Sequence, residues 1–130
     1  MDGDVRTAPR LSSPVRVGLA VFLLLHGIAH LAGAGDAFTA ADRDDTVDYF
    51  FGAWEVGGAV LATLGVLWVV LAATFVITAG WVASSRPNWL FVLAGAAAAS
   101  LVLSILALPL AWIGVLINAA LLGFVVVQRR

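Results

Sequence analysis

The chain has 130 residues, of which 62% are hydrophobic and only 12% charged, and its mean hydropathy is +1.05. Soluble domains are about half apolar and about a quarter charged, so this excess of apolar residues predicts an integral membrane protein. The sequence has no cysteine and no basic cluster, which excludes disulfides, thiolate catalysis, cysteine metal sites and nucleic acid as a partner.

The chain begins with a polar stretch, residues 1–14, that contains two prolines and has no apolar periodicity. It predicts a flexible tail in the aqueous phase. An apolar span follows over residues 15–33, long enough at ~1.5 Å per residue to cross a hydrocarbon core of roughly 30 Å. A cleaved signal peptide is the alternative, with Arg6, Arg10 and Arg16 as its basic region. Two histidines inside the apolar run argue against cleavage, so we predict a first transmembrane helix.

Residues 36–48 form an acidic segment in which five aspartates surround one arginine. We predict a solvated loop. The alternative is a site for a hard cation such as Ca²⁺, although the regular aspartate spacing of a calcium loop is missing.

Residues 49–85 are again almost wholly apolar, which is too long for one upright span and too short for two. We predict one long second helix over this stretch, tilted or projecting from the membrane beside the acidic loop. The alternative is a short interfacial helix near 47–56, followed by a span over residues 57–84. In either case the chain crosses the membrane once here.

A serine pair, an arginine and a proline in residues 84–88 predict a turn. A third span covers residues 89–106, a break at 107–109 contains a proline, and a fourth span covers residues 110–127. The predicted fold class is therefore all-α: a transmembrane, up-and-down four-helix bundle over residues 15–130, with a long second helix.

The arginines support this topology. If the N-terminus is cytoplasmic, six of the seven arginines fall on the cytoplasmic side and only Arg43 falls outside, as the positive-inside rule requires. We therefore expect a multi-pass protein of the cell membrane with both termini in the cytoplasm. All seven Lys/Arg positions are arginine, and seven of the eight acidic residues are aspartate, a composition that favours a prokaryotic source.

Two histidines and one carboxylate lie within the apolar stretches: His26, His30 and Glu55. The histidines are four residues apart and project from one side of the first helix, in its outer half. Because the second helix starts at the outer face, Glu55 is expected at the same depth as His30. Ionisable groups in lipid are costly, so a cluster of this kind is a candidate functional site.

Three interpretations of this cluster stay open. It would be a structural hydrogen-bonded cluster tying two helices together, or a site for Zn²⁺ or another divalent transition metal, or a proton-handling or quinone-binding site. Haem fits less well, since axial ligands come from opposite faces of the porphyrin. Asn118, in the middle of the fourth span, is a further intramembrane polar residue expected to bond between helices.

A pattern over the first two predicted helices resembles the DoxX-like family of small four-helix membrane proteins. The residues that carry it are Arg16, Phe22, His26-Gly27, Glu55, Gly57-Gly58 and Leu64-Gly65. The resemblance implies an up-and-down four-helix bundle, in a group with some members that are subunits of membrane redox complexes acting on sulfur compounds and quinone. It implies no catalytic residue for this chain.

Several functions therefore remain open, and the sequence does not decide whether the protein is an enzyme. The first is an accessory or scaffolding subunit of a membrane complex, redox complexes included, which associates with other membrane subunits or with itself. The second is a metal-, quinone- or haem-binding redox protein that uses His26, His30 and Glu55. The third is a small transporter, which would have to oligomerise to enclose a path.

Overall fold

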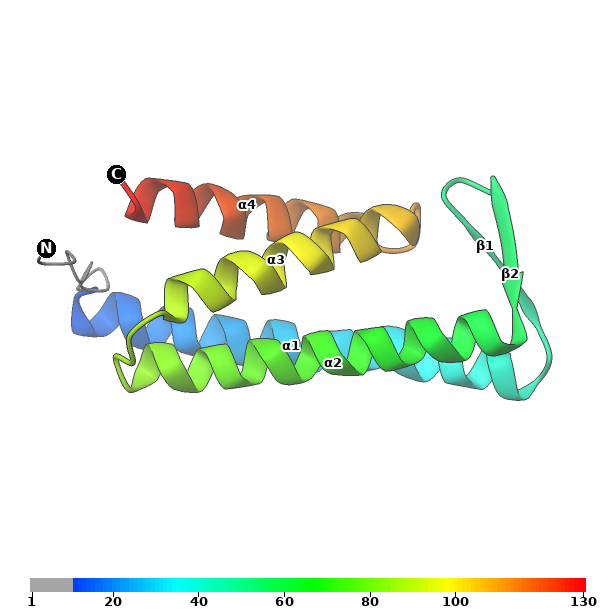
Figure 1. The fold of residues 1–130 in the computed structure, drawn as a ribbon, viewed down its shortest axis with the longest axis horizontal. Coiled ribbons are helices and arrows are strands. Elements are labelled where there is room, and N and C mark those ends of the chain that lie inside the picture. Colours follow the sequence, from blue (N-terminus) through cyan, green and yellow to red (C-terminus); the bar gives the residue numbers. More distant parts are fainter. Residues whose placement is uncertain (1–10) are drawn as a thin grey trace, which may run out of the picture.

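The computed structural model describes residues 11–130, and this part of the chain is mostly helical. It contains four α-helices and one small β-hairpin, as the ribbon in Figure 1 shows. In chain order the elements are α1 (Ser13–Asp42), β1 (Thr46–Tyr49), β2 (Trp54–Gly57), α2 (Gly58–Ala83), α3 (Trp89–Leu106) and α4 (Trp112–Gln128). The predicted four-helix fold is confirmed. The tail predicted for residues 1–14 falls mainly outside the described residues.

Helix α1 is longer than the sequence indicated. It begins at Ser13 with Pro14 in its first turn, where the missing backbone N–H costs nothing. It then continues to Asp42 instead of ending near residue 33. Residues 36–42, predicted to belong to the acidic loop, are therefore the last turns of a helix about 45 Å long.

The largest correction concerns residues 49–57, which we predicted to be the first turns of the second helix. They form most of an antiparallel hairpin in which Thr46 pairs with Gly57 and Tyr49 with Trp54. The alternative of a short interfacial helix near 47–56 is equally wrong. Two glycines with positive φ allow this path, Gly52 (79°) at the hairpin tip and Gly58 (49°) where the chain turns into α2. The second helix then has 26 residues.

The helices pack in pairs. Helices α1 and α2 share the longest interface, α3 packs on α4, and α2 joins the pairs through α3. In Figure 1 successive helices run back and forth along the long axis of the molecule, with the start of α1 and the C-terminus at one end. Helices α1 and α4 make few direct contacts with each other.

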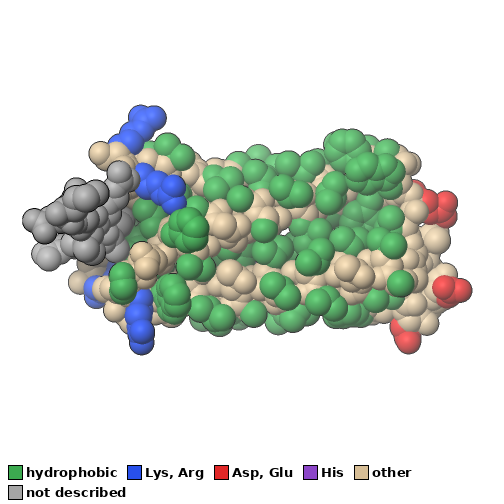
Figure 2. Space-filling view, viewed as in Figure 1, with side chains coloured by type: hydrophobic (Ala, Val, Ile, Leu, Met, Phe, Trp, Pro, Cys, Tyr) green, Lys and Arg blue, Asp and Glu red, His purple; other side chains and the backbone are tan. Residues whose placement is uncertain are grey.

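Charged side chains gather at the two ends of the molecule and leave an apolar belt between them, as Figure 2 shows. Arginines mark one end, which we call the basic end, and aspartates mark the other, the acidic end. Helices α1, α2 and α3 are long and apolar enough to cross a membrane, and α4 is an apolar helix of 17 residues. The chain is a small polytopic membrane protein whose apolar helices face the lipid bilayer.

The interior has two unequal halves. At the basic end, buried residues from all four helices form one continuous cluster, the packed half, which includes Leu23, Phe75, Leu93, Leu121 and Val125. Towards the acidic end a second cluster is built mainly from α1, α2, the hairpin and the end of α3. We call this the hollow half, because it also contains a cavity, described below.

Candidate functional site

A layer of four hydrogen-bonded polar side chains lies between the packed and hollow halves. His26 and His30 come from α1, Ser100 from α3 and Asn118 from α4. All four are buried. We call them the polar layer. The sequence predicted that the histidines share a face of their helix and that Asn118 bonds between helices, and the geometry has both features.

The directions of these hydrogen bonds follow from two backbone carbonyls. His30 Nδ1 lies 2.7 Å from the carbonyl oxygen of His26, which can only accept, so Nδ1 carries the proton. The neutral ring then accepts at Nε2 from the Ser100 hydroxyl, at 2.7 Å. Each nitrogen of the His30 ring therefore has one defined role.

Asn118 is oriented in the same way. Its Nδ2 donates to the carbonyl of Gly114 and to Ser100 Oγ, both at 2.8 Å. Its Oδ1 must therefore face His26 Nε2, which lies 3.3 Å away and donates to it. His26 is thus protonated at Nε2, the tautomer opposite to that of His30.

Aromatic rings enclose the two histidines. Phe75 of α2 lies edge-on to His26, with ring centroids 4.7 Å apart, and 5.2 Å from His30. Trp68 lies 5.3 Å from His30. Helix α2 comes this close because position 27 is glycine: a Cβ there would lie 2.9 Å from the carbonyl oxygen of Ala72. The polar layer is thereby fixed against a rigid apolar wall.

The cavity of the hollow half begins at this polar layer. It has a volume of about 370 Å³, within the range of small-molecule sites. It lies between α1 and α4 and extends to the hairpin at the acidic end. Its lining is mainly apolar, and the residues able to hydrogen-bond include His26, His30, Tyr49, Ser104 and Asp36.

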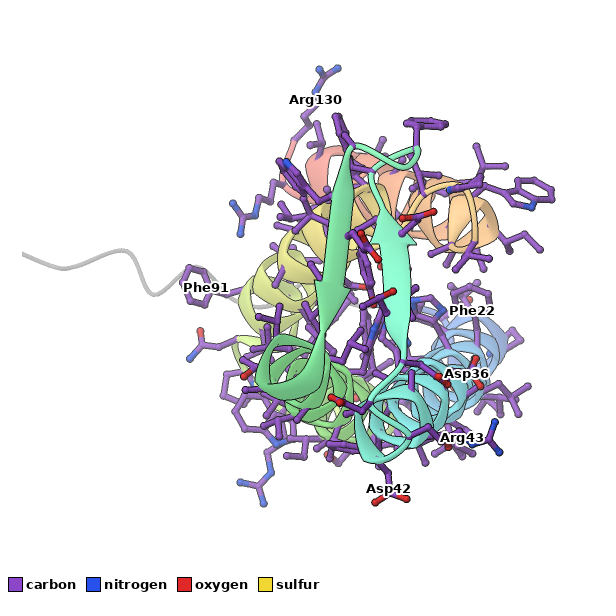
Figure 3. The ribbon with its side chains drawn as sticks, turned by 90° about the vertical axis from the view of Figure 1, so that its right-hand side faces the viewer. Phe22, Asp36, Asp42, Arg43, Phe91 and Arg130 are labelled. Carbon is purple, nitrogen blue, oxygen red and sulfur yellow. The ribbon has the colours of Figure 1, made fainter. Side chains whose placement is uncertain are left out.

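The hairpin covers the acidic end of this cavity. Figure 3 looks onto that end and shows β1 and β2 crossing the bundle from α1 and α2 towards α3 and α4. Its tip is fixed to the α3–α4 connection, because the backbone N–H of Phe50 donates to Leu106 (2.7 Å) and that of Phe51 to Leu108 (3.0 Å). Tyr49 faces inward from β1, and burial raises the pKa of its hydroxyl.

Glu55 does not join the histidines. It lies on β2, is exposed, and accepts a hydrogen bond of 2.7 Å from Thr46 Oγ1. Within residues 11–130 no group of three or more His, Cys, Asp or Glu side chains is arranged to hold a metal ion. The predicted convergence of His26, His30 and Glu55 is therefore wrong for Glu55. The physical reason is strand alternation: Val56 and Tyr49 point towards the bundle, which turns Glu55 to the opposite face.

Ser100 and Ser104 are site residues that were not predicted from the sequence. Ser100 bonds His30 and Asn118, and Ser104 lines the cavity. Both lie on the inward face of α3, four residues apart. That spacing in an otherwise apolar span was the available signal, because it puts two hydroxyls on one face of a helix. The stretch was predicted only as part of the third apolar span.

Comparisons with protein-family profiles, with curated proteins and with solved structures found no match for this chain. The function must therefore be inferred from the site itself.

Proposed function

We propose that this membrane protein binds a small lipid-soluble ring molecule of the quinone class in the cavity of the hollow half. The observation that carries the proposal is the cavity of about 370 Å³, apolar along its sides, with His26 and Ser104 in its lining. Ligand sites typically combine such an apolar enclosure with a few fixed polar groups. The polar layer supplies this fixed end, because its bonds and the surrounding rings hold both histidines in place.

The position of the cavity supports access from the lipid phase. It lies between α1 and α4, the neighbouring helices with few direct contacts. Ala29 is exposed on α1 and also belongs to the cavity lining, so the cavity reaches the lipid-facing surface there. A molecule dissolved in the bilayer would enter sideways, without crossing the aqueous phase.

The proposed orientation places the hollow half in the outer leaflet. The arginines at the basic end support a cytoplasmic location for that end and for both termini, by the positive-inside rule. Helix α4 then forms the fourth crossing, since 17 residues span about 26 Å. Membership of the DoxX-like group of prokaryotic membrane proteins is part of the proposal, supported by the residues around His26-Gly27 and Gly57-Gly58.

Thermal unfolding of the detergent-purified protein, with increasing decylubiquinone, tests this function. Binding should raise the unfolding midpoint as the quinone concentration rises. The variant Ala29→Phe, which puts a ring at the opening, should abolish the shift. The matched control is Ala98→Phe, at an exposed position of α3 outside the cavity, and it should shift like the wild type. No shift in the wild type, or equal shifts in both variants, would contradict the proposal.

A second candidate function is that of an accessory subunit. The observation that favours it is the surface of α3, where Gly95, Ala98 and Ala99 are exposed to the lipid side. Small residues let transmembrane helices approach closely. Co-purification from native membranes in mild detergent tests this function. A stoichiometric partner that Ala98→Phe releases would support it, and a lone protein would contradict it.

A further inference from the structure

One nitrogen in the polar layer has no partner. His26 donates from Nε2 to Asn118, so in the neutral ring Nδ1 can only accept. Within residues 11–130 no hydrogen bond reaches this nitrogen. Within residues 11–130 the hydrogen bonds of the two histidine rings go to Asn118, to Ser100 and to the His26 carbonyl, and none goes to a carboxylate. Both rings are therefore neutral, since a buried charge without a partner is strongly disfavoured.

This nitrogen is also accessible. Among the described residues, the one side-chain nitrogen or oxygen that is both fully buried and unpaired is Nε of Arg16, at the other end of the bundle. His26 Nδ1 is unpaired and so must retain some accessible surface. Because His26 lines the cavity, a ligand there can reach a fixed hydrogen-bond acceptor.

We infer that the molecule bound in the cavity places a hydroxyl group against Nδ1 of His26, so that the site prefers a hydroxyl-bearing, reduced ring compound over its ketone form. This rests on the proposed function. A ketone oxygen can only accept, and facing Nδ1 it would leave two acceptors unpaired in an apolar enclosure. A hydroxyl donates to Nδ1 and satisfies both groups.

The second hydroxyl of such a ring also has partners. Ser104 and Tyr49 line the cavity on α3 and β1, and each has a hydroxyl that can donate or accept. They accommodate either oxidation state of a ring compound and so do not discriminate. At the polar layer His26 is the group that does, because its tautomer is fixed by Asn118 and, through Asn118, by the Gly114 carbonyl.

The test is to measure binding of decylubiquinol and decylubiquinone anaerobically to the detergent-purified, full-length protein. We expect the quinol to bind about fivefold to tenfold more tightly, the contribution of one hydrogen bond. Equal affinity for the two forms, with both lost in Ala29→Phe, would overturn this inference and leave the proposed function standing. Failure of both forms to bind would overturn the proposed function and the inference with it.

Two variants isolate the role of His26. His26→Phe keeps a ring and removes Nδ1, so the two forms should bind with equal affinity. Ser100→Ala interrupts the polar layer but leaves the Gly114 carbonyl to orient Asn118, so the preference for the quinol should persist. A preference that survives in His26→Phe, or that disappears in Ser100→Ala, would overturn the inference. If His26→Phe fails to fold, the affinity ratios of the wild type and Ser100→Ala still decide it.

Discussion

At the basic end of the bundle, side chains from all four helices of the described chain fill one cluster, whereas at the acidic end α1 and α4 border a cavity that a β-hairpin covers. The packed half holds the helices together by close apolar contact. The hollow half leaves a gap between α1 and α4, and backbone bonds from the hairpin tip to Leu106 and Leu108 close its end. One small bundle thus combines a filled end with a hollow end, and the proposed ligand site lies in the hollow one.

The polar layer lies where the two halves meet and belongs to both. It ties α1 to α3 and α4 through His30–Ser100 and His26–Asn118, a structural role. His26 also lines the cavity, the site of the proposed ligand. The structural interpretation of the intramembrane histidines and the ligand-binding one are therefore compatible.

The largest expected effect compares equal truncations in the two halves. Leu93 and Leu61 are 0% and 1% exposed, but only Leu61 borders the cavity. Leu93→Ala should lower the free energy of unfolding by about 2–3 kcal/mol, since it opens a new void in a filled interior. Leu61→Ala enlarges an existing space and should cost about 1 kcal/mol. The free energies are measured by unfolding in detergent. Equal losses for the two variants would contradict the distinction between a packed half and a hollow half.

The second-largest loss of stability is expected from removing the Asn118 amide of the polar layer. Asn118→Ala eliminates bonds to His26, Ser100 and Gly114, and at the strength measured within membranes this should cost about 2 kcal/mol. The control is Thr63→Ala, whose exposed hydroxyl bonds only the Ala59 carbonyl of its own helix. The control should change the free energy of unfolding by less than about 0.5 kcal/mol. A similar loss in the free energy of unfolding for both variants would contradict a structural role for the polar layer.

The α1–α2 interface gives the third prediction. Gly27→Ala places a Cβ 2.9 Å from the Ala72 carbonyl, a backbone atom that cannot rotate away, and should destabilise by about 1–2 kcal/mol. Gly18 lies on the same helix with nothing within 4 Å of its Cβ position. Gly18→Ala should be neutral or slightly stabilising, so a matching loss there would show that the effect is not steric.

The hairpin tip carries the smallest effect. Phe51 has φ of 58°, a strained conformation for a bulky residue, and it is 70% exposed. Phe51→Asn should raise the free energy of unfolding slightly, by about 0.5 kcal/mol, because asparagine tolerates this conformation. Phe91→Asn makes the same change at an exposed helical position and should destabilise. Destabilisation at both positions would argue against strain in the tip.

The four helices could be predicted, because hydropathy is a property of each span alone. The third predicted span, residues 89–106, coincides with α3. The i, i+4 spacing of His26 and His30 also indicated a shared face. The hairpin was missed since each strand has only four residues, too few for their alternation to stand out within a long apolar run.

The error at Glu55 followed from that miss. Glu55 was predicted at the depth of His30 within a helix, whereas it lies on a strand, which sends alternate side chains to opposite faces. The cavity was not predictable at all, because it depends on how far apart α1 and α4 lie. Those helices are not consecutive in the chain, and no sequence pattern of either reports the distance between them.

The central claim is that the hollow half holds the ligand, and photolabelling with an azido-substituted quinone in membranes tests it most directly. Mass spectrometry of the labelled peptides should place the label on residues 26–37 and 104–117, which contribute most of the cavity lining. Excess unlabelled quinol should compete it away. Label spread over the exposed lipid-facing residues of α2, such as Val66 and Val70, without competition would contradict the account.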